Sequence, residues 1–89
     1  MLKITRVESL SQEITLQLDG SVTGQWVGLL REYAGSALKE GVRLTLDLEN
    51  ISFIDCEGLA VIKSLIDCGV QQVNAPLFVA EQMRKCEGD

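Results

Sequence analysis

Alternation of apolar and polar residues predicts four β-strands along the chain. The clearest case is residues 13–20, in which every second residue is apolar. A strand with one buried and one exposed face has this period. The period returns, less regularly, in three other segments: residues 2–8, 42–53 and 70–75. The polar link between the first two strands suggests a hairpin, and Gly20 is expected to end the second strand.

Between these strands, apolar residues recur every three or four positions, which predicts amphipathic helices. This spacing covers residues 23–41, 58–69 and 76–86. Thr23 is the expected N-cap of the first helix, and Gly41 and Gly69 are the expected stops of the first two. The residues expected on the buried side of the first helix are Trp26, Leu29, Leu30, Tyr33, Ala37 and Leu38. Those expected on the buried side of the last helix are Leu77, Phe78, Ala80, Met83 and Cys86.

The order of elements is therefore β-β-α-β-α-β-α. Strands that follow crossover helices tend to pair in parallel, whereas the opening hairpin adds an antiparallel edge. We predict an α/β fold with a mixed, mostly parallel sheet of about four strands and helices packed on it. At 89 residues the chain is expected to form a single domain over residues 1–89.

Charge and composition exclude several classes of function. The net charge is −5, which argues against a nucleic-acid groove and against docking on anionic lipid. No apolar run approaches the ~20 residues of a membrane span, so we expect a cytoplasmic protein. The three cysteines are odd in number and form no C-x-x-C pair, which predicts free thiols. The sequence has no histidine, and we expect neither a metal nor a cofactor.

The junction of the third strand and second helix, Asp55-Cys56-Glu57-Gly58, is the main candidate for a site. Asp55 suits an N-cap, and Glu57 is favoured in the first turn by the helix dipole. On this tetrapeptide alone, an ordinary helix cap is the favoured interpretation. Cys56 is flanked by carboxylates that disfavour a reactive thiol, so it is interpreted as a half-buried filler. The other two cysteines, Cys68 and Cys86, are expected in the core.

Three segments together resemble the STAS domain family, typified by bacterial anti-sigma factor antagonists. They are "LQLDGSVT", "LTLDLENISFIDCEGLAVI" and "NAPLFVAEQMRKC". In phosphorylatable members of the family, the serine directly after the signature Asp accepts phosphate from an anti-sigma kinase. Cys56 occupies that position here, and Glu57 occupies the next one, usually Ser or Thr. Asp55, Gly58 and Leu59 match the signature.

The resemblance implies a non-enzymatic protein-interaction module in bacterial signalling or transcription, with no phosphorylation at the usual site. The partner would be an anti-sigma factor kinase or another sensory protein, and homodimerisation stays open. The residues expected to bind it, from a loop and a helix start, are Asp19, Gly20, Ser21, Thr23, Asp55, Cys56, Glu57, Gly58 and Leu59. One alternative is a cytoplasmic STAS subunit of a lipid-transport ABC system, which would bind an ATPase subunit. An alternative of another class is a thiol-based redox sensor using Cys56.

Overall fold

The predicted order of strands and helices is confirmed. The computed structural model describes the backbone of residues 2–87 and the side chains of residues 2–84. The elements are β1 (Leu2–Glu8), β2 (Glu13–Val22), α1 (Gln25–Lys39), β3 (Arg43–Ile54), α2 (Cys56–Asp67), β4 (Gln71–Val73) and α3 (Leu77–Glu87).

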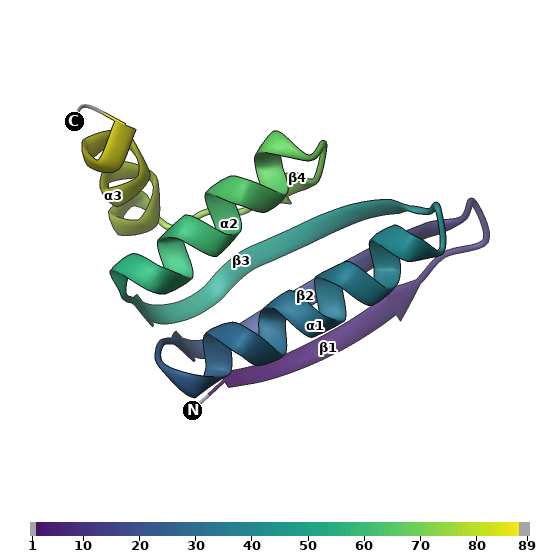
Figure 1. The fold of residues 1–89 in the computed structure, drawn as a ribbon, viewed down its shortest axis with the longest axis horizontal. Helices are drawn as coiled ribbons and strands as arrows, with labels where there is room; N and C mark the ends of the chain where they lie inside the picture. Colours follow the sequence, from purple (N-terminus) through teal and green to yellow (C-terminus); the bar gives the residue numbers. More distant parts are fainter. Residues whose placement is uncertain (1, 88–89) are drawn as a thin grey trace.

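The four strands form one mixed sheet in the order β1-β2-β3-β4. The β1–β2 hairpin is antiparallel, and β2–β3 and β3–β4 are parallel. Helix α1 connects β2 to β3, and α2 connects β3 to β4, so both connections move one strand along the sheet in the same direction. Right-handed crossovers of this kind place both helices on the same face of the sheet. Figure 1 shows α1 and α2 side by side over that face. The predicted mixed, mostly parallel sheet is therefore confirmed.

The register of the strands separates a buried face of the sheet from an open one. Leu16 of β2 pairs with Leu46 of β3, and both are fully buried beneath the helices. The neighbouring pair, Gln17 and Asp47, lies on the opposite face, where it is not buried. Among the described residues the core contains no polar or charged side chain. Burial of the leucine-rich face is therefore the main force that holds the helices on the sheet.

Helix α1 buries Leu30 and Ala37 as predicted, but the rest of its buried stripe differs from the predicted one. Its buried residues are Val27, Leu30, Ala34 and Ala37. Tyr33, expected in the core, is 39% exposed, and Trp26 is only partly buried. The short side chains of the two alanines let the helix lie close to the sheet, so the helix turns this narrow face inward.

Strand β2 runs two residues beyond its predicted end. Gly20 does not stop it, because Ser21 and Val22 still pair with Phe53 and Ile54 of β3. The register shifts between Gly20 and Ser21, and Gly20 has a φ of 113°. Glycine tolerates this conformation at an irregularity in a strand. What resembled a loop at residues 19–23 is therefore mostly strand.

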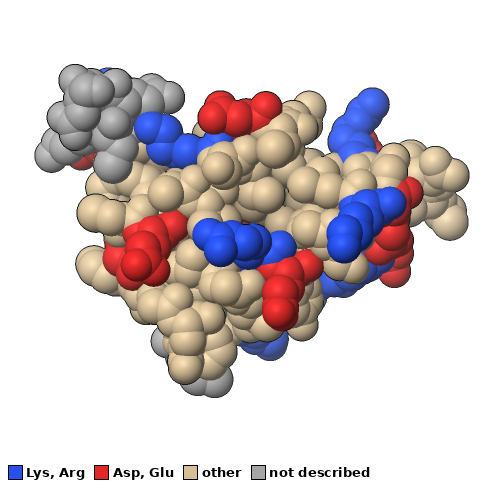
Figure 2. Space-filling model, in the orientation of Figure 1, with Lys and Arg blue, Asp and Glu red and all other residues tan. Residues whose placement is uncertain are grey.

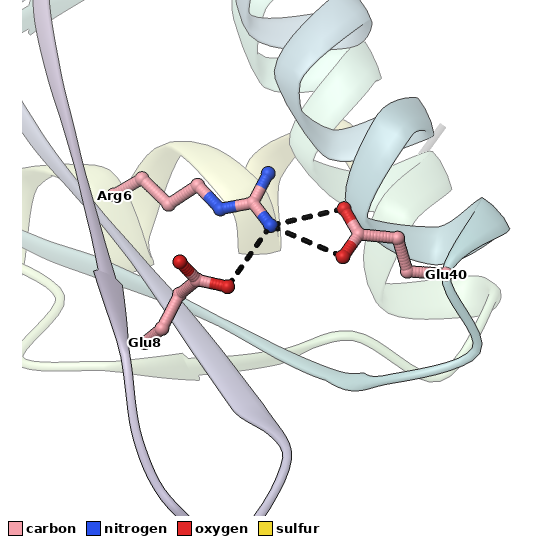
Figure 3. A network of polar contacts seen from close by, with 3 residues as sticks. All are labelled: Arg6, Glu8 and Glu40. Carbon is pink, nitrogen blue, oxygen red and sulfur yellow. Dashed lines mark hydrogen bonds and ion pairs between the residues drawn. The ribbon is translucent and has the colours of Figure 1, made fainter.

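The free edge of the sheet at β1 carries an ionic network on the side that faces the helices (Figure 3). The Arg6 guanidinium donates to both carboxylate oxygens of Glu40, at 2.9 and 3.2 Å, and to Glu8 at 3.3 Å. These hydrogen bonds, first to Glu40 and then to Glu8, raise the pKa of Arg6. An inward-facing charge on an edge strand disfavours pairing with a strand of another chain.

The last helix forms where it was predicted, but most of the described residues expected on its buried side are exposed. Val79 is its fully buried residue, whereas Leu77 is 76% exposed. Phe78 and Ala80 are exposed too, and Met83 is partly buried. Val79 and Met83 are four positions apart, so they lie on the same face of the helix, and this is the face that turns inward. The expected residues Phe78 and Ala80 are each one position away from Val79.

The cysteine and hydropathy predictions have separate outcomes. Cys68, expected in the core, is exposed because it is the C-cap of α2 rather than part of its apolar stripe. The side chain of Cys86 lies outside the described residues. Within the described part of the chain, no helix is both long and apolar enough to cross a membrane.

Candidate docking site at the ends of β2 and β3

Two strand-to-helix junctions meet at one edge of the sheet. Val22 and Ile54, the last residues of the parallel strands β2 and β3, are register partners. Each strand runs within three residues into a helix, so α1 and α2 begin at the same end of the molecule (Figure 1). The carboxyl ends of parallel strands are a common place for binding sites in α/β folds.

Asp55 joins the two junctions. Its Oδ1 accepts a hydrogen bond from the Gly58 backbone N–H at 2.8 Å, which caps α2 as predicted. Its Oδ2 accepts from the Gly24 backbone N–H at 3.2 Å, at the start of α1. The Asp55 N–H donates to the carbonyl of Val22 at 3.2 Å. One side chain thus fixes the relative position of both helix starts.

Gly58 is required by close backbone contact. A Cβ atom at this position would lie 2.5 Å from the Val22 carbonyl oxygen and 2.8 Å from Val22 Cγ1. The first turn of α2 therefore rests directly on the end of β2, and Gly58 is buried. Gly58 is therefore a point of close approach within the protein itself, between α2 and the end of β2.

The predicted cap of α1 was wrong by one residue. The N-cap is Gly24, with a φ of 53°, and no side chain of its own caps the helix. The glycine conformation moves the turn beyond Thr23, whose carbonyl accepts from the Trp26 N–H at 3.0 Å. The charge that stabilises this helix start comes instead from Asp55.

The structure brings together part of the predicted partner-binding set. Ser21 and Thr23 are partly exposed at the end of β2, and Cys56 and Glu57 are exposed at the start of α2. Leu59 is in the core, so its side chain contributes to packing. Asp19 and Gly20 lie further back within β2, where they pair with Asn50 and Ile51.

Sequence reasoning missed Phe53 as a candidate contact residue. It is the register partner of Ser21 and is 54% exposed. An exposed aromatic side chain with polar neighbours is a frequent anchor in protein interfaces. The signal was present in the sequence as an aromatic residue two positions before Asp55.

The charge and shape of this edge suit contact with another protein. A groove of about 370 Å³ between α1 and α2 begins at Gly24 and Glu57 and is lined further along by Gly28, Arg31 and Ser64, among others. On the face of the molecule shown in Figure 2, which carries α1 and α2, acidic and basic side chains of the described residues are interspersed. The thiols of Cys56 and Cys68 are twelve residues apart on α2, about 18 Å by the helical rise, too far for a disulfide.

The fold is similar to that of solved structures of SpoIIAA. The unphosphorylated form of the anti-sigma factor antagonist SpoIIAA matches with a TM-score of 0.64 and 18% identity, covering 94% of this chain and 80% of that chain. The phosphorylated form of the Bacillus cell fate determinant SpoIIAA matches with a TM-score of 0.73 and 13% identity, covering 94% and 83%. The crystal structure of Mglu matches with a TM-score of 0.57 and 21% identity, covering 79% of this chain and 18% of that chain. At these identities the likeness is one of fold.

No curated protein matches the sequence significantly. The family model of the STAS domain matches residues 3–81. That span reaches from β1 into α3 and contains both strand-to-helix junctions. Since the match covers most of the chain, the protein belongs to the STAS domain family.

Proposed function

We propose that this protein is a non-enzymatic interaction module of the anti-sigma factor antagonist type. It would regulate a signalling or transcription partner in the bacterial cytoplasm. The observation that carries the proposal is the exposure of Cys56 and Glu57 on a helix start that Asp55 and Gly58 hold in place. Residues that have no packing role, on a fixed scaffold, are suited to contact a partner.

The proposed docking face consists of Ser21, Thr23, Phe53, Cys56 and Glu57. Phe53 and its register partner Ser21 lie on the face of the sheet away from the helices, where Phe53 supplies apolar area, and Thr23 and Glu57 supply polar groups at the strand-to-helix junctions. The face has a carboxylate and no basic side chain, so it favours a partner surface with lysine or arginine. Asp55 and Gly58 position the face but are themselves engaged within the protein.

In this proposal, phosphorylation does not set partner binding. SpoIIAA is known in phosphorylated and unphosphorylated forms, and the family resemblance places the acceptor serine at Cys56. A thiol is not a usual substrate for a serine kinase. Glu57 carries one negative charge, whereas a phosphoserine carries nearly two and has three acceptor oxygens. It is therefore a weak substitute for a phosphate and lies one residue later.

The first experiment tests phosphorylation. Wild type and Cys56→Ser are each incubated with an anti-sigma factor kinase from the same genome and ATP, and residues 52–60 are mapped by mass spectrometry. We expect phosphate on the Cys56→Ser variant and none on wild type in this segment. Phosphate on wild-type residues 52–60 would refute a phosphorylation-independent site. Phosphate on neither protein would count against recognition of the docking face by such a kinase.

The second experiment tests the docking face. Wild type, Phe53→Ala and Glu57→Lys are used as bait in lysate of the native organism, and a retained kinase is then measured by direct titration. Val7→Ala and Glu32→Lys are matched controls, because both residues are exposed and lie outside the docking face. We expect the two docking-face variants to lose the kinase and the controls to retain it. Retention of an ATPase subunit of a transporter in place of a kinase would favour the lipid-transport alternative.

A further inference from the structure

In the described part of the chain, β4 is an edge strand of the sheet, and a groove beside it is filled by no described residue. The groove has a volume of about 430 Å³ and lies between α2, β4 and α3. Figure 1 shows α3 beside α2, on the β4 side of the sheet. The apolar residues of the groove are Ile66, Leu77, Ala80 and Met83. Leu77, the first residue of α3, is 76% exposed, so this rim of the groove presents an apolar side chain to solvent.

The two edges of the sheet are protected differently. Edge strand β1 carries Lys3, Arg6 and Glu8, and Arg6 is held on its helix-facing side by Glu40. Edge strand β4 has the sequence Gln-Gln-Val, with all three residues exposed and none charged. Charged residues on an edge oppose association with other chains. Only the β1 edge has this protection, so association is less strongly opposed at β4.

The charges around the groove are balanced. Among the described side chains that line it, Lys63 and Arg84 contribute +2, and Asp67 and Glu81 contribute −2, so the sum is 2 − 2 = 0. The whole protein has a net charge of −5, and two copies therefore repel each other on average. A face with both signs and no net charge avoids that repulsion. It can also complement itself, because a two-fold axis brings each residue opposite a different one on the other copy.

We infer that a second copy of this chain docks on the β4 face, which consists of the groove residues of α2 and α3 together with the exposed edge of β4. In this arrangement Leu77 of each copy enters the groove of the other, and basic and acidic side chains pair across the two-fold axis. Because β4 has three residues, strand pairing can add only a few hydrogen bonds. The association is therefore expected to be weak and to depend on protein concentration.

The test is the mass of the full chain in solution, measured by sedimentation equilibrium over a hundredfold range of concentration. Wild type is expected to shift from monomer to dimer. Leu77→Lys is expected to weaken self-association roughly tenfold or more. Leu10→Lys is the matched control, because Leu10 is also highly exposed but lies in the β1–β2 turn. Circular dichroism verifies that each variant is folded.

Charge reversal gives a second and independent readout. Lys63→Glu changes the charge of the face to −2, and Glu81→Lys changes it to +2. Each variant alone is expected to be a weaker dimer than wild type, and an equimolar mixture is expected to associate more strongly than either. Wild type that stays monomeric throughout the concentration range would overturn the inference. A dimer that Leu77→Lys leaves unchanged, or one that Leu10→Lys weakens equally, would place the interface elsewhere and would overturn it too.

Discussion

Replacing Gly58 by alanine is expected to destabilise the fold, although glycine-to-alanine changes within helices are usually stabilising. The added Cβ would lie 2.5 Å from the Val22 carbonyl oxygen. A carbon–oxygen contact needs about 3.3 Å, so the gap must open by about 0.8 Å. That oxygen belongs to the backbone of β2 and accepts a hydrogen bond from Asp55 at 3.2 Å. Helix α2 therefore cannot move away without stretching the connection between the two junctions.

The size of the effect follows from two opposing terms. Forced overpacking costs about 1–3 kcal/mol, and the higher helix propensity of alanine returns up to about 1 kcal/mol. We expect Gly58→Ala to lower the free energy of unfolding by about 1–2 kcal/mol. For a domain of this length the total is roughly 5 kcal/mol, so the loss is easily measured.

Gly35 in α1 is the matched control. A Cβ at this position would meet no atom within 4 Å, so Gly35→Ala is expected to raise stability by about 0.5–1 kcal/mol. Both variants and wild type are unfolded in urea, with circular dichroism and the fluorescence of Trp26, the only tryptophan, as probes. A Gly58→Ala midpoint at or above that of wild type, with an unchanged m-value, would show that the contact with Val22 is not rigid.

Three further predictions concern the cap, the thiols and the edge network. Asp55→Ala is expected to lower stability by about 1 kcal/mol or more in urea unfolding. Asp55→Asn is expected to lose less, because its amide oxygen can still cap α2, but its NH2 group cannot accept the hydrogen bond from the Gly24 N–H; equal loss in both would contradict a capping role. A thiol reagent is expected to label Cys56 and Cys68 in the folded protein, as located by peptide mass mapping, and protection of either until denaturation would contradict its exposure. Arg6→Gln is expected to destabilise slightly at low salt and less at high salt. The hydrogen bonds to Glu40 raise the pKa of Arg6, so its contribution is fully present below the ordinary arginine pKa. Urea unfolding at mildly acidic and mildly basic pH should therefore show the same difference, and a difference that changes with pH would contradict this.

The order of elements and the type of sheet could be predicted because local signals agreed with one another. Alternating leucines in β2 and β3, glycines at 41 and 69 and the Asp55 cap all act within a few residues of the chain. Gly41 and Gly69 have φ values of 73° and 100°, as expected for residues that end helices. Local patterns of this kind determine where elements begin and end in most of this chain.

Features that depend on contacts between distant residues could not be predicted. The hydrogen bond from Gly24 to Asp55 joins residues 31 positions apart and depends on how β2 pairs with β3. The irregularity at Gly20 is invisible in the alternation, because the strand resumes its pairing at once. The sequence therefore predicts one half of the candidate site at the start of α2, where Cys56 and Glu57 are exposed, and the other half at residues 19–23, where Asp19 and Gly20 belong to β2.

The same contacts that hold the fold together leave positions 56 and 57 free to change. Asp55 and Gly58 provide the cap and the backbone contact, and the two residues between them point outward and pack against nothing in the core. Exchange of serine for cysteine at position 56 therefore costs the fold little, whereas exchange of either flanking residue is expected to cost about 1 kcal/mol or more. Under the proposed function, control by phosphorylation can therefore be absent while the scaffold that presents these two residues persists. On this reasoning, Cys56→Ser should leave the urea midpoint unchanged and alter only how the docking face responds to a kinase.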